Sequence, residues 1–374
     1  MLKKKYILFS FTCLFISTFS NCNSTDNRVE LPSSENISKA TSIELTHIRD
    51  FFIEPTSEVT IDRVYDIASF NQQGNKIAWI NSDKNQVFVT NTKGDHLFNF
   101  GSSGRGPEEF LEVFSVGFDS NDNVIVYDAK LDSFKKFNSL GLLVDTYDGI
   151  RDHGIFTYTR KLHFNDDFLF ISAMEMEKAN EKNFWKSKTV AKLNLKFELI
   201  DLMGQYDPGL TGTTFLYKYP MVTFDPENDK IYTNHRTLPF TQVFSIKNSR
   251  NLGRFGINSS SFKNAEDAAL RSDPTHIRRQ KNLNQSFVEE SFVSNDYYFL
   301  QHSTYSEDVI TYGDTFLRES YLNVFEKNPP YRFLGEIKLE SIPVHITNEN
   351  QVYLLKDNNP DNFTVEVYDL VIDI

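Results

Sequence analysis

Short runs of alternating hydrophobic and polar residues recur along most of this chain, and they predict β-strands. Within Val113–Gly149 four such runs follow one another: Val113–Asp119, Asn123–Asp128, Ser133–Asn138 and Leu142–Tyr147. Polar turns rich in Asn, Asp and Gly separate the runs, and these residues tolerate the left-handed backbone angles of tight hairpins. The segment therefore predicts one four-stranded antiparallel sheet.

The same unit recurs along the chain. Arg63–Gly101 aligns with Val113–Gly149, and their third turns, Asn91–Gly94 and Asn138–Gly141, lie 47 residues apart. Four further segments repeat the unit with drift: Leu162–Met203, Met221–Gly256, Phe287–Lys338 and Ile342–Ile374. Four antiparallel strands in each unit of about 40–50 residues are typical of propeller blades.

The pattern predicts an all-β fold, a six-bladed β-propeller of four-stranded antiparallel blades, over residues 40–374. One blade cannot bury both of its faces alone, and the 34 Phe and 17 Tyr are suited to fill the wedges between blades. The last unit lacks a strand after Ile374, whereas Ala40–His47 has no other partner. We expect this N-terminal strand to complete the last blade and close the ring. The alternative is a pair of stacked β-sandwiches, which the regular repeat disfavours.

One polar segment, about 258–285, departs from the repeat. Ala265–Arg271 has a helical composition, and Pro274 interrupts it. Its place between the fourth and fifth units predicts a helical insertion on one face of the propeller. A tolerated surface insertion without further role explains it more simply, because long loops cost little free energy.

The first residues predict export. Lys3, Lys4 and Lys5 precede an apolar run from Tyr6 to Phe19, which has the length of a signal-peptide core and is short for a membrane span. Ser20-Asn21-Cys22 follows and resembles a bacterial lipoprotein signal, in which the cysteine carries the lipid. This resemblance implies a signal peptide over residues 1–21 and lipidation of Cys22, although Phe19 and Asn21 depart from the usual pattern. Cleavage after Ser20, which would release a soluble protein, and an uncleaved anchor are the alternatives.

Residues 22–39 are polar and contain Ser, Asn and Pro, so they are expected to form a flexible tether. Cys13 and Cys22 are the only cysteines of the chain. A disulfide or a cysteine-based metal site within the propeller is therefore excluded.

The stretch Gly101–Tyr147 resembles an NHL-type repeat. Its lead, Gly101-Ser-Ser-Gly104-Arg105-Gly106-Pro107-Glu108-Glu109-Phe110, is similar to that of the six-bladed propeller lipoproteins of Bacteroidetes-like bacteria. The resemblance implies a propeller in the bacterial cell envelope, lipid-anchored to the outer membrane on its periplasmic or surface side. It implies no activity, because a fold does not fix a function.

Charge and composition narrow the possible partners. The chain carries a net charge of −12, and its first 21 residues hold three lysines and no acid, so the remainder carries −15. An acidic surface repels phosphate backbones, which disfavours nucleic acid as a partner. The membrane, through the lipid anchor, and a protein, peptide or glycan are the partners we expect.

Candidate site residues come from the glycine-rich lead. Arg105, Glu108 and Glu109 lie on a predicted blade-to-blade connection, where they could rim the channel mouth and bind a ligand. The simpler alternative is that they pair with one another or with solvent. The lead lacks the Gly-Lys-Ser/Thr end of a phosphate loop. Asp119–Asn123 lacks the glycine and glutamate of a calcium loop and fits an Asx-rich hairpin turn.

No catalytic motif is evident. The eight His are scattered, and neither HExxH nor GxSxG occurs. No cofactor is indicated, although a divalent metal held in the axial channel by residues from several blades would be invisible in sequence. Three functions stay open: a non-catalytic envelope protein that binds a partner through one face, a metal-dependent lactonase-like or lyase-like enzyme, and an architectural subunit of a surface complex.

Overall fold

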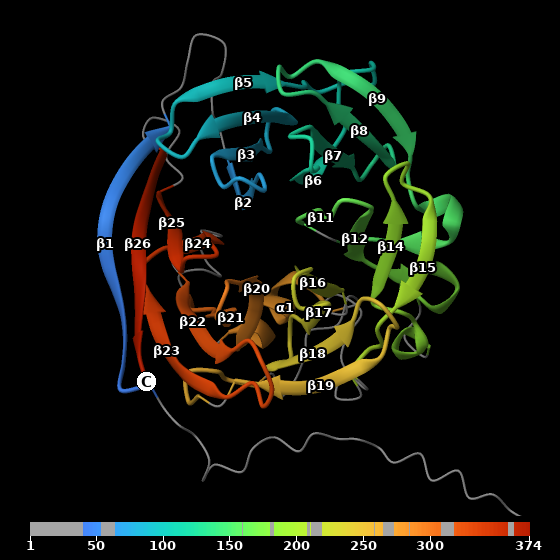
Figure 1. The fold of residues 1–374 in the computed structure, drawn as a ribbon. Coiled ribbons are helices and arrows are strands. Elements are labelled where there is room, and N and C mark those ends of the chain that lie inside the picture. Colours follow the sequence, from blue (N-terminus) through green and yellow to red (C-terminus); the bar gives the residue numbers. More distant parts are fainter. Residues whose placement is uncertain are drawn as a thin grey trace, which may run out of the picture.

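A computed structural model gives the fold of the chain, and Figure 1 views it along the central axis. It describes residues 40–53, 64–158, 160–179, 183–207, 210, 219–257, 259–264, 273–283, 285–307, 318–357 and 363–374. The predicted signal peptide, the tether and Cys22 lie outside these residues, and so does Ala265–Arg271.

Within the described part of the chain, six four-stranded antiparallel sheets surround one axis. In blades 1 to 5 the strands run from the axis outward in chain order, and blade 6 takes its fourth strand from the N-terminus. Blade 1 contains β2 (Val64–Phe70), β3 (Lys76–Asn81), β4 (Gln86–Asn91) and β5 (His96–Phe100). Blade 2 contains β6 (Val113–Phe118), β7 (Val124–Asp128), β8 (Ser133–Phe137) and β9 (Leu143–Asp148). Blade 3 contains β11 (His163–Phe164), β12 (Phe168–Ser172), β14 (Val190–Asn194) and β15 (Leu199–Met203).

The second half of the ring repeats this order. Blade 4 contains β16 (Pro220–Asp225), β17 (Lys230–His235), β18 (Phe240–Ser245) and β19 (Asn251–Gly256). Blade 5 contains β20 (Ser286–Val293), β21 (Tyr297–Thr304), β22 (Glu319–Glu326) and β23 (Phe333–Leu339). Blade 6 contains β24 (Ile342–Ile346), β25 (Gln351–Asp357), β26 (Phe363–Asp373) and β1 (Ser42–Ile53). The predicted six-bladed propeller is confirmed, and the strands of blade 2 match the sequence prediction to within one residue.

The N-terminal strand closes the ring as predicted. β1 pairs antiparallel with β26 from Ser42 opposite Asp373 to Ile53 opposite Phe363. It is longer than the expected Ala40–His47, because Phe51 and Ile53 continue the alternation and are buried against blades 6 and 1. Such closure removes the exposed edge that β26 would otherwise present.

Aromatic pairs fill the wedges between neighbouring blades. Ring centroids of Phe100 and Phe137, from blades 1 and 2, lie 3.9 Å apart. Three further pairs of neighbouring blades are joined in the same way. Their ring centroids lie 4.5 Å apart for Phe134 and Phe197, 4.7 Å for Phe170 and Phe224, and 4.5 Å for Tyr232 and Tyr298. These contacts explain the high Phe and Tyr content of the chain, since each blade needs large side chains on both faces.

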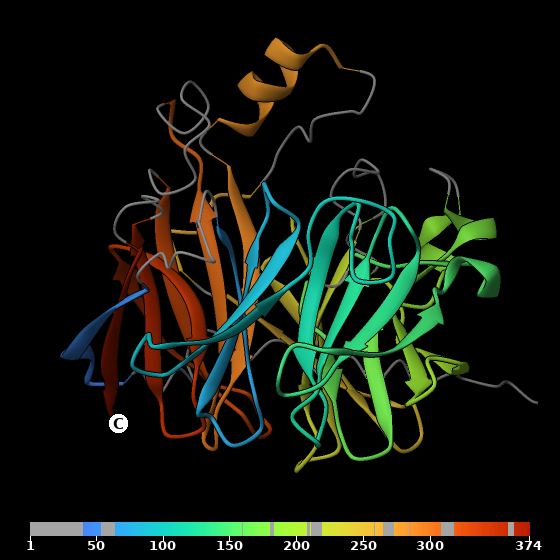
Figure 2. The ribbon, with the colours of Figure 1, turned by 90° about the horizontal axis from the view of Figure 1, so that it is seen from above.

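The two ends of the ring differ. The end that carries the turns between first and second strands, and between third and fourth strands, is called the turn face here. The opposite end carries the connections between blades and is called the connection face. Helix α1 (Thr275–Asn282) begins directly after Pro274 and stands above the connection face, whereas the C-terminus lies at the turn face (Figure 2).

Short elements decorate blades 2 and 3. A two-stranded sheet pairs β10 (Ile155–Phe156) with β13 (Met174–Glu175), and three 3₁₀ turns span Arg151–His153, Met176–Lys178 and Phe184–Lys186. No helix among the described residues is long and apolar enough to cross a membrane.

Candidate functional site

A cavity of about 240 Å³ lies on the propeller axis at the turn face. Its walls are the last residues of the six innermost strands and the first residues of the turns that follow them. Each blade contributes at least one large apolar side chain and polar neighbours to the wall. From blade 1 to blade 6 these apolar side chains include Phe70, Phe118, Phe164, Phe224, Phe292 and Ile346. A site of this kind is assembled only when the ring closes.

Lys161 forms the base of the cavity. It precedes β11 of blade 3, and its side chain crosses the axis: the Nζ atom lies 3.3 Å from the carbonyl oxygen of Val344 in blade 6. The same ammonium lies 3.5 Å from Glu290 Oε2 and 4.4 Å from the ring centroid of Phe292, both in blade 5. The Lys161 and Glu290 side chains are only 13% and 17% exposed, so the pair attracts more strongly than an exposed ion pair would.

Two neutral histidines line the cavity. Burial, assisted by the charge of Lys161, lowers the pKa of His345 to about 3. Burial and Lys161 also lower the pKa of His163 to about 4. His345 stacks on Phe70 of the neighbouring blade with ring centroids 3.8 Å apart. At neutral pH both imidazoles therefore present uncharged hydrogen-bonding groups.

Blades 2 and 3 meet closely beside Lys161. Val116 and Lys161 form an isolated parallel bridge, and Leu162 N donates to Val116 O at 3.4 Å. A Cβ atom on Gly117 would lie 2.7 Å from Leu162 Cβ. The glycine is thus required by this close approach, which brings Lys161 to the axis.

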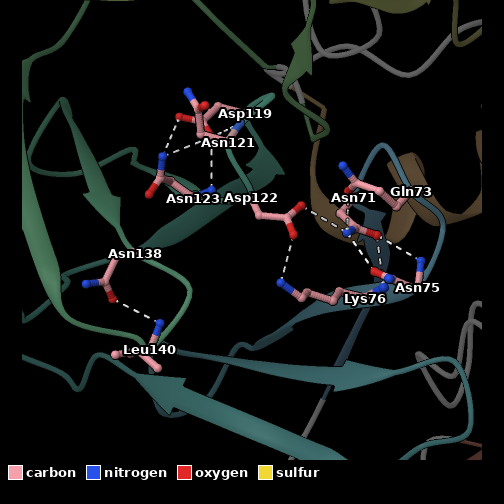
Figure 3. Close-up of polar contacts among 10 residues, drawn as sticks. All are labelled: Asn71, Gln73, Asn75, Lys76, Asp119, Asn121, Asp122, Asn123, Asn138 and Leu140. Atoms are coloured by element: carbon pink, nitrogen blue, oxygen red, sulfur yellow. Dashed lines mark hydrogen bonds and ion pairs between the residues drawn. The ribbon is translucent and has the colours of Figure 1, made fainter.

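A polar network holds the mouth of the cavity (Figure 3). Asp119 Oδ1 accepts the backbone N–H groups of Asn121 and Asn123, each at 2.9 Å. Lys136 Nζ donates to Asp119 Oδ2 at 2.7 Å. Burial alone would raise the pKa of Asp119, but the hydrogen bonds from Lys136 and Asn123 outweigh it and leave the pKa lowered. This geometry confirms the Asx-rich turn.

The network also crosses between blades. Asp122 of blade 2 accepts hydrogen bonds from Asn71 Nδ2 at 3.0 Å and Lys76 Nζ at 2.8 Å, both in blade 1. The acidic turn residues Asp119 and Asp122 are therefore partnered by lysines of the propeller itself.

The predicted residues Arg105, Glu108 and Glu109 lie at the other end of the molecule and do not line the cavity. Their loop packs over Phe110, which is fully buried, and Lys135 Nζ donates to the carbonyl oxygens of Gly106 and Glu109. Glu109 Oε2 accepts the N–H of Gly106 at 2.6 Å, whereas Arg105 and Glu108 are exposed. Two of the three side chains are thus presented to solvent on the connection face.

A comparison with known protein families identifies the family to which this propeller belongs. A family model described as a 6-bladed beta-propeller, DUF5128, matches residues 20–252. The chain belongs to this family. The resemblance inferred from the glycine-rich lead, which lies inside the matched range, is confirmed as to the propeller family.

Solved structures from Bacteroides resemble this DUF5128 member in fold. A member of the DUF4221 family from Bacteroides vulgatus is 12% identical, with a TM-score of 0.68 over 89% of this chain and 100% of that chain. A candidate exported protein from Bacteroides fragilis is 10% identical, with a TM-score of 0.56 over 89% of this chain and 96% of that chain. No curated protein matches the sequence. At such identities the likeness shows the propeller fold alone.

A serine–histidine contact in this DUF5128 propeller was invisible in the sequence. His302 Nδ1 accepts from Asn323 Nδ2 at 2.7 Å, so Nε2 carries the proton toward Ser261 Oγ at 3.1 Å. Ser261 Oγ in turn donates to Glu336 Oε2 at 2.5 Å. The histidine is a donor to the serine and not its base, so this chain of hydrogen bonds fastens the connecting segment to blade 5.

Among the described residues, no three His, Cys, Asp or Glu side chains gather closely enough to hold a metal ion. Of the residues that line the axial cavity, only Asp119 and Ser120 belong to a segment that the sequence analysis considered for a calcium site, and it was interpreted as a turn rather than as a binding site. The only local signal of the cavity residues is an aromatic followed by Asn or Asp at the end of a strand, as in Phe70-Asn71, Phe118-Asp119, Phe164-Asn165 and Phe224-Asp225.

Proposed function

We propose that this protein is a non-catalytic lipoprotein of the bacterial cell envelope, which binds a protein, peptide or glycan partner through the turn face of its propeller. The observation that carries this proposal is the axial cavity, to which all six blades contribute side chains. Convergent polar groups within an otherwise apolar concavity are the usual setting of a binding site.

The lining of the cavity favours an uncharged polar group. Phenylalanine rings supply apolar walls, while His163, His345 and Ser69 supply neutral hydrogen-bonding groups. The charge of Lys161 is already balanced by Glu290. With about 240 Å³, the cavity suits one sugar ring or one amino-acid side chain, since whole drug-sized ligands occupy larger pockets of about 300–1,000 Å³.

The envelope location rests on the N-terminal sequence and on one neighbour. Residues 1–22 have the order of a lipoprotein signal, with lysines, an apolar run and Cys22. The candidate exported protein from Bacteroides fragilis shares the fold. Both observations support export, and the position of Cys22 after the apolar run supports lipid attachment there.

The test is a binding screen that compares the two faces. The purified chain is applied to arrays of immobilised oligosaccharides and peptides, and each ligand found is titrated by calorimetry. The Ser120→Trp variant fills the mouth of the cavity, because Ser120 lines it, and is expected to abolish binding.

A matched variant addresses the connection face. Arg105→Ala/Glu108→Ala removes the two exposed side chains of the glycine-rich loop and should leave the affinity unchanged. If this double variant loses binding while Ser120→Trp keeps it, the ligand site lies at Arg105 and Glu108 and the cavity assignment is wrong.

A further inference from the structure

Eight of the thirteen exposed large apolar side chains of the described residues lie toward the turn face, whereas Ile48, Phe52, Tyr158, Met176 and Trp185 lie elsewhere. The eight belong to the outer strands and turns of four consecutive blades, 6, 1, 2 and 3. This apolar arc consists of Val371, Ile374, Leu97, Leu140, Leu142, Val144, Leu195 and Ile200. Leu140 and Leu142 are 71% and 57% exposed, which is unusual for clustered leucines on a soluble surface.

The centre of the apolar arc is held in place. Asn138 Oδ1 accepts the N–H groups of Leu140 and Leu142, each at 3.0 Å, and Figure 3 shows the bond to Leu140. Gly141 has a φ of +77°, and a Cβ atom there would lie 3.1 Å from Phe98 Cδ2. The turn therefore packs directly on β5, which carries Leu97.

The chain enters the propeller at the same end. Ser42 pairs with Asp373 at the turn-face end of blade 6, beside Val371 and Ile374. Cys22 precedes Ser42 by 20 residues, a length that spans at most about 70 Å when fully extended. A lipid on Cys22 would therefore be tethered to the propeller at the end that carries the apolar arc.

We infer that the apolar arc rests on the surface of the bilayer that holds the lipid anchor, with Leu140 and Leu142 in the interfacial layer. This inference rests on the proposed lipidation of Cys22. A lipid anchor combined with a second apolar contact gives much firmer membrane binding than a single weak contact. The corresponding turns of blades 4 and 5, residues 246–250 and 327–332, carry no exposed large apolar side chain, so we expect them to stand further from the lipid than the arc does.

Membrane contact on this side also has a consequence for the cavity. Its mouth opens on the turn face, next to the bilayer. A partner carried on the same membrane is therefore favoured over one that diffuses freely.

The experiment measures lipid contact at single positions. The lipidated chain is purified in detergent and reconstituted into phosphatidylcholine vesicles whose acyl chains are brominated. In the mature chain Cys22 is the only cysteine and is blocked by the lipid, so one introduced cysteine can be labelled with a fluorophore. Leu140→Cys is expected to lose most of its fluorescence to bromine quenching.

Two labelled variants serve as controls. Lys247→Cys occupies an exposed turn of the same kind in blade 4, and His276→Cys lies on α1 at the opposite face; both should keep their fluorescence. Equal quenching at 140 and 247, or none at 140, overturns the inference. Shielding of the 140 label in native membranes but not in lipid vesicles also overturns it, in favour of a protein contact.

Flotation of the same vesicles separates the two proposals. Chain that floats with the vesicles but shows no quenching at 140 retains the anchor and refutes the bilayer contact. Chain that does not float refutes lipidation at Cys22 and the inference built on it.

Discussion

Single residues acquire their roles here from burial rather than from any local motif. His163, His302 and His345 are scattered in sequence, yet burial holds the pKa of each at about 3 to 4 in the folded chain. In the unfolded chain each histidine returns to about 6.5. Their effect on stability follows from this difference in pKa.

Lowering the pH should destabilise the propeller through these histidines. Between about pH 6.5 and pH 4 the unfolded chain binds protons that the native chain does not, so the free energy of unfolding falls as pH falls. Above pH 6.5 this contribution is constant. We expect a loss of about 2 kcal/mol per histidine on going from pH 7.5 to pH 5, measured by urea unfolding.

The variant His345→Gln isolates one of these contributions. Its loss of stability between pH 7.5 and pH 5 should be smaller than that of the wild type by about 2 kcal/mol. Carboxylate titration is common to both proteins and cancels in the difference. An identical loss in the two proteins would show that His345 is not held neutral by the fold.

At the scale of elements, β1 closes the ring, although it is the strand furthest in sequence from the rest of its blade. β1 comes from the N-terminus and supplies the outer strand of the C-terminal blade. Its alternation places Phe51 in the core between blades 6 and 1, at 4% exposure, and Phe52 on the surface, at 51%. Substitutions of Phe51 and Phe52 can therefore be compared directly, one for its effect on core packing and the other for its effect at the surface.

Replacing Phe51 should open the ring at its closure. We expect Phe51→Ala to lower the free energy of unfolding by about 3 kcal/mol, because a buried phenylalanine leaves a cavity when truncated. Phe52→Ala, one residue away, should change it by less than about 0.5 kcal/mol. Chemical denaturation of both variants checks the result, and equal effects would mean that β1 is not docked as described.

At the scale of the whole molecule, Lys161 joins blades that no strand pairing connects. It lies next to blade 3, and its ammonium contacts Glu290 in blade 5 and Val344 in blade 6. The Lys161 side chain therefore crosses the axial channel, and its ammonium group forms the charged base of the axial cavity.

Removing this lysine should destabilise the ring. Lys161→Met leaves Glu290 with its charge and without its axial partner, and we expect a loss of about 2–4 kcal/mol in the free energy of unfolding. Lys161→Met/Glu290→Gln should recover part of that loss. Lys338→Met, which breaks an exposed pair with Glu319, should destabilise the protein far less, because solvent screens exposed ion pairs. A similarly small effect of Lys161→Met would contradict the role of Lys161 at the axis.

Much of the fold could be predicted because it is encoded locally. The turns at Asn91–Gly94 and Asn138–Gly141 indicated equivalent hairpins, and both proved to join the third and fourth strands of their blades. The candidate site was not predicted in the same way. Arg105 and Glu108 stood out because they lie in a distinctive contiguous motif, whereas the cavity residues come from six separate strand ends.

The amino-acid sequence by itself determined the repeat, the strands and the need for a closing strand, because alternation and turn chemistry act between residues close in the chain. Only the tertiary structure decided which side chains meet on the axis, that Lys161 crosses it, and that the exposed leucines of blades 1 and 2 share one end with the start of β1. Those relations depend on how six sheets are placed around a circle. Residues more than a hundred positions apart become neighbours there, and no local pattern records such distances.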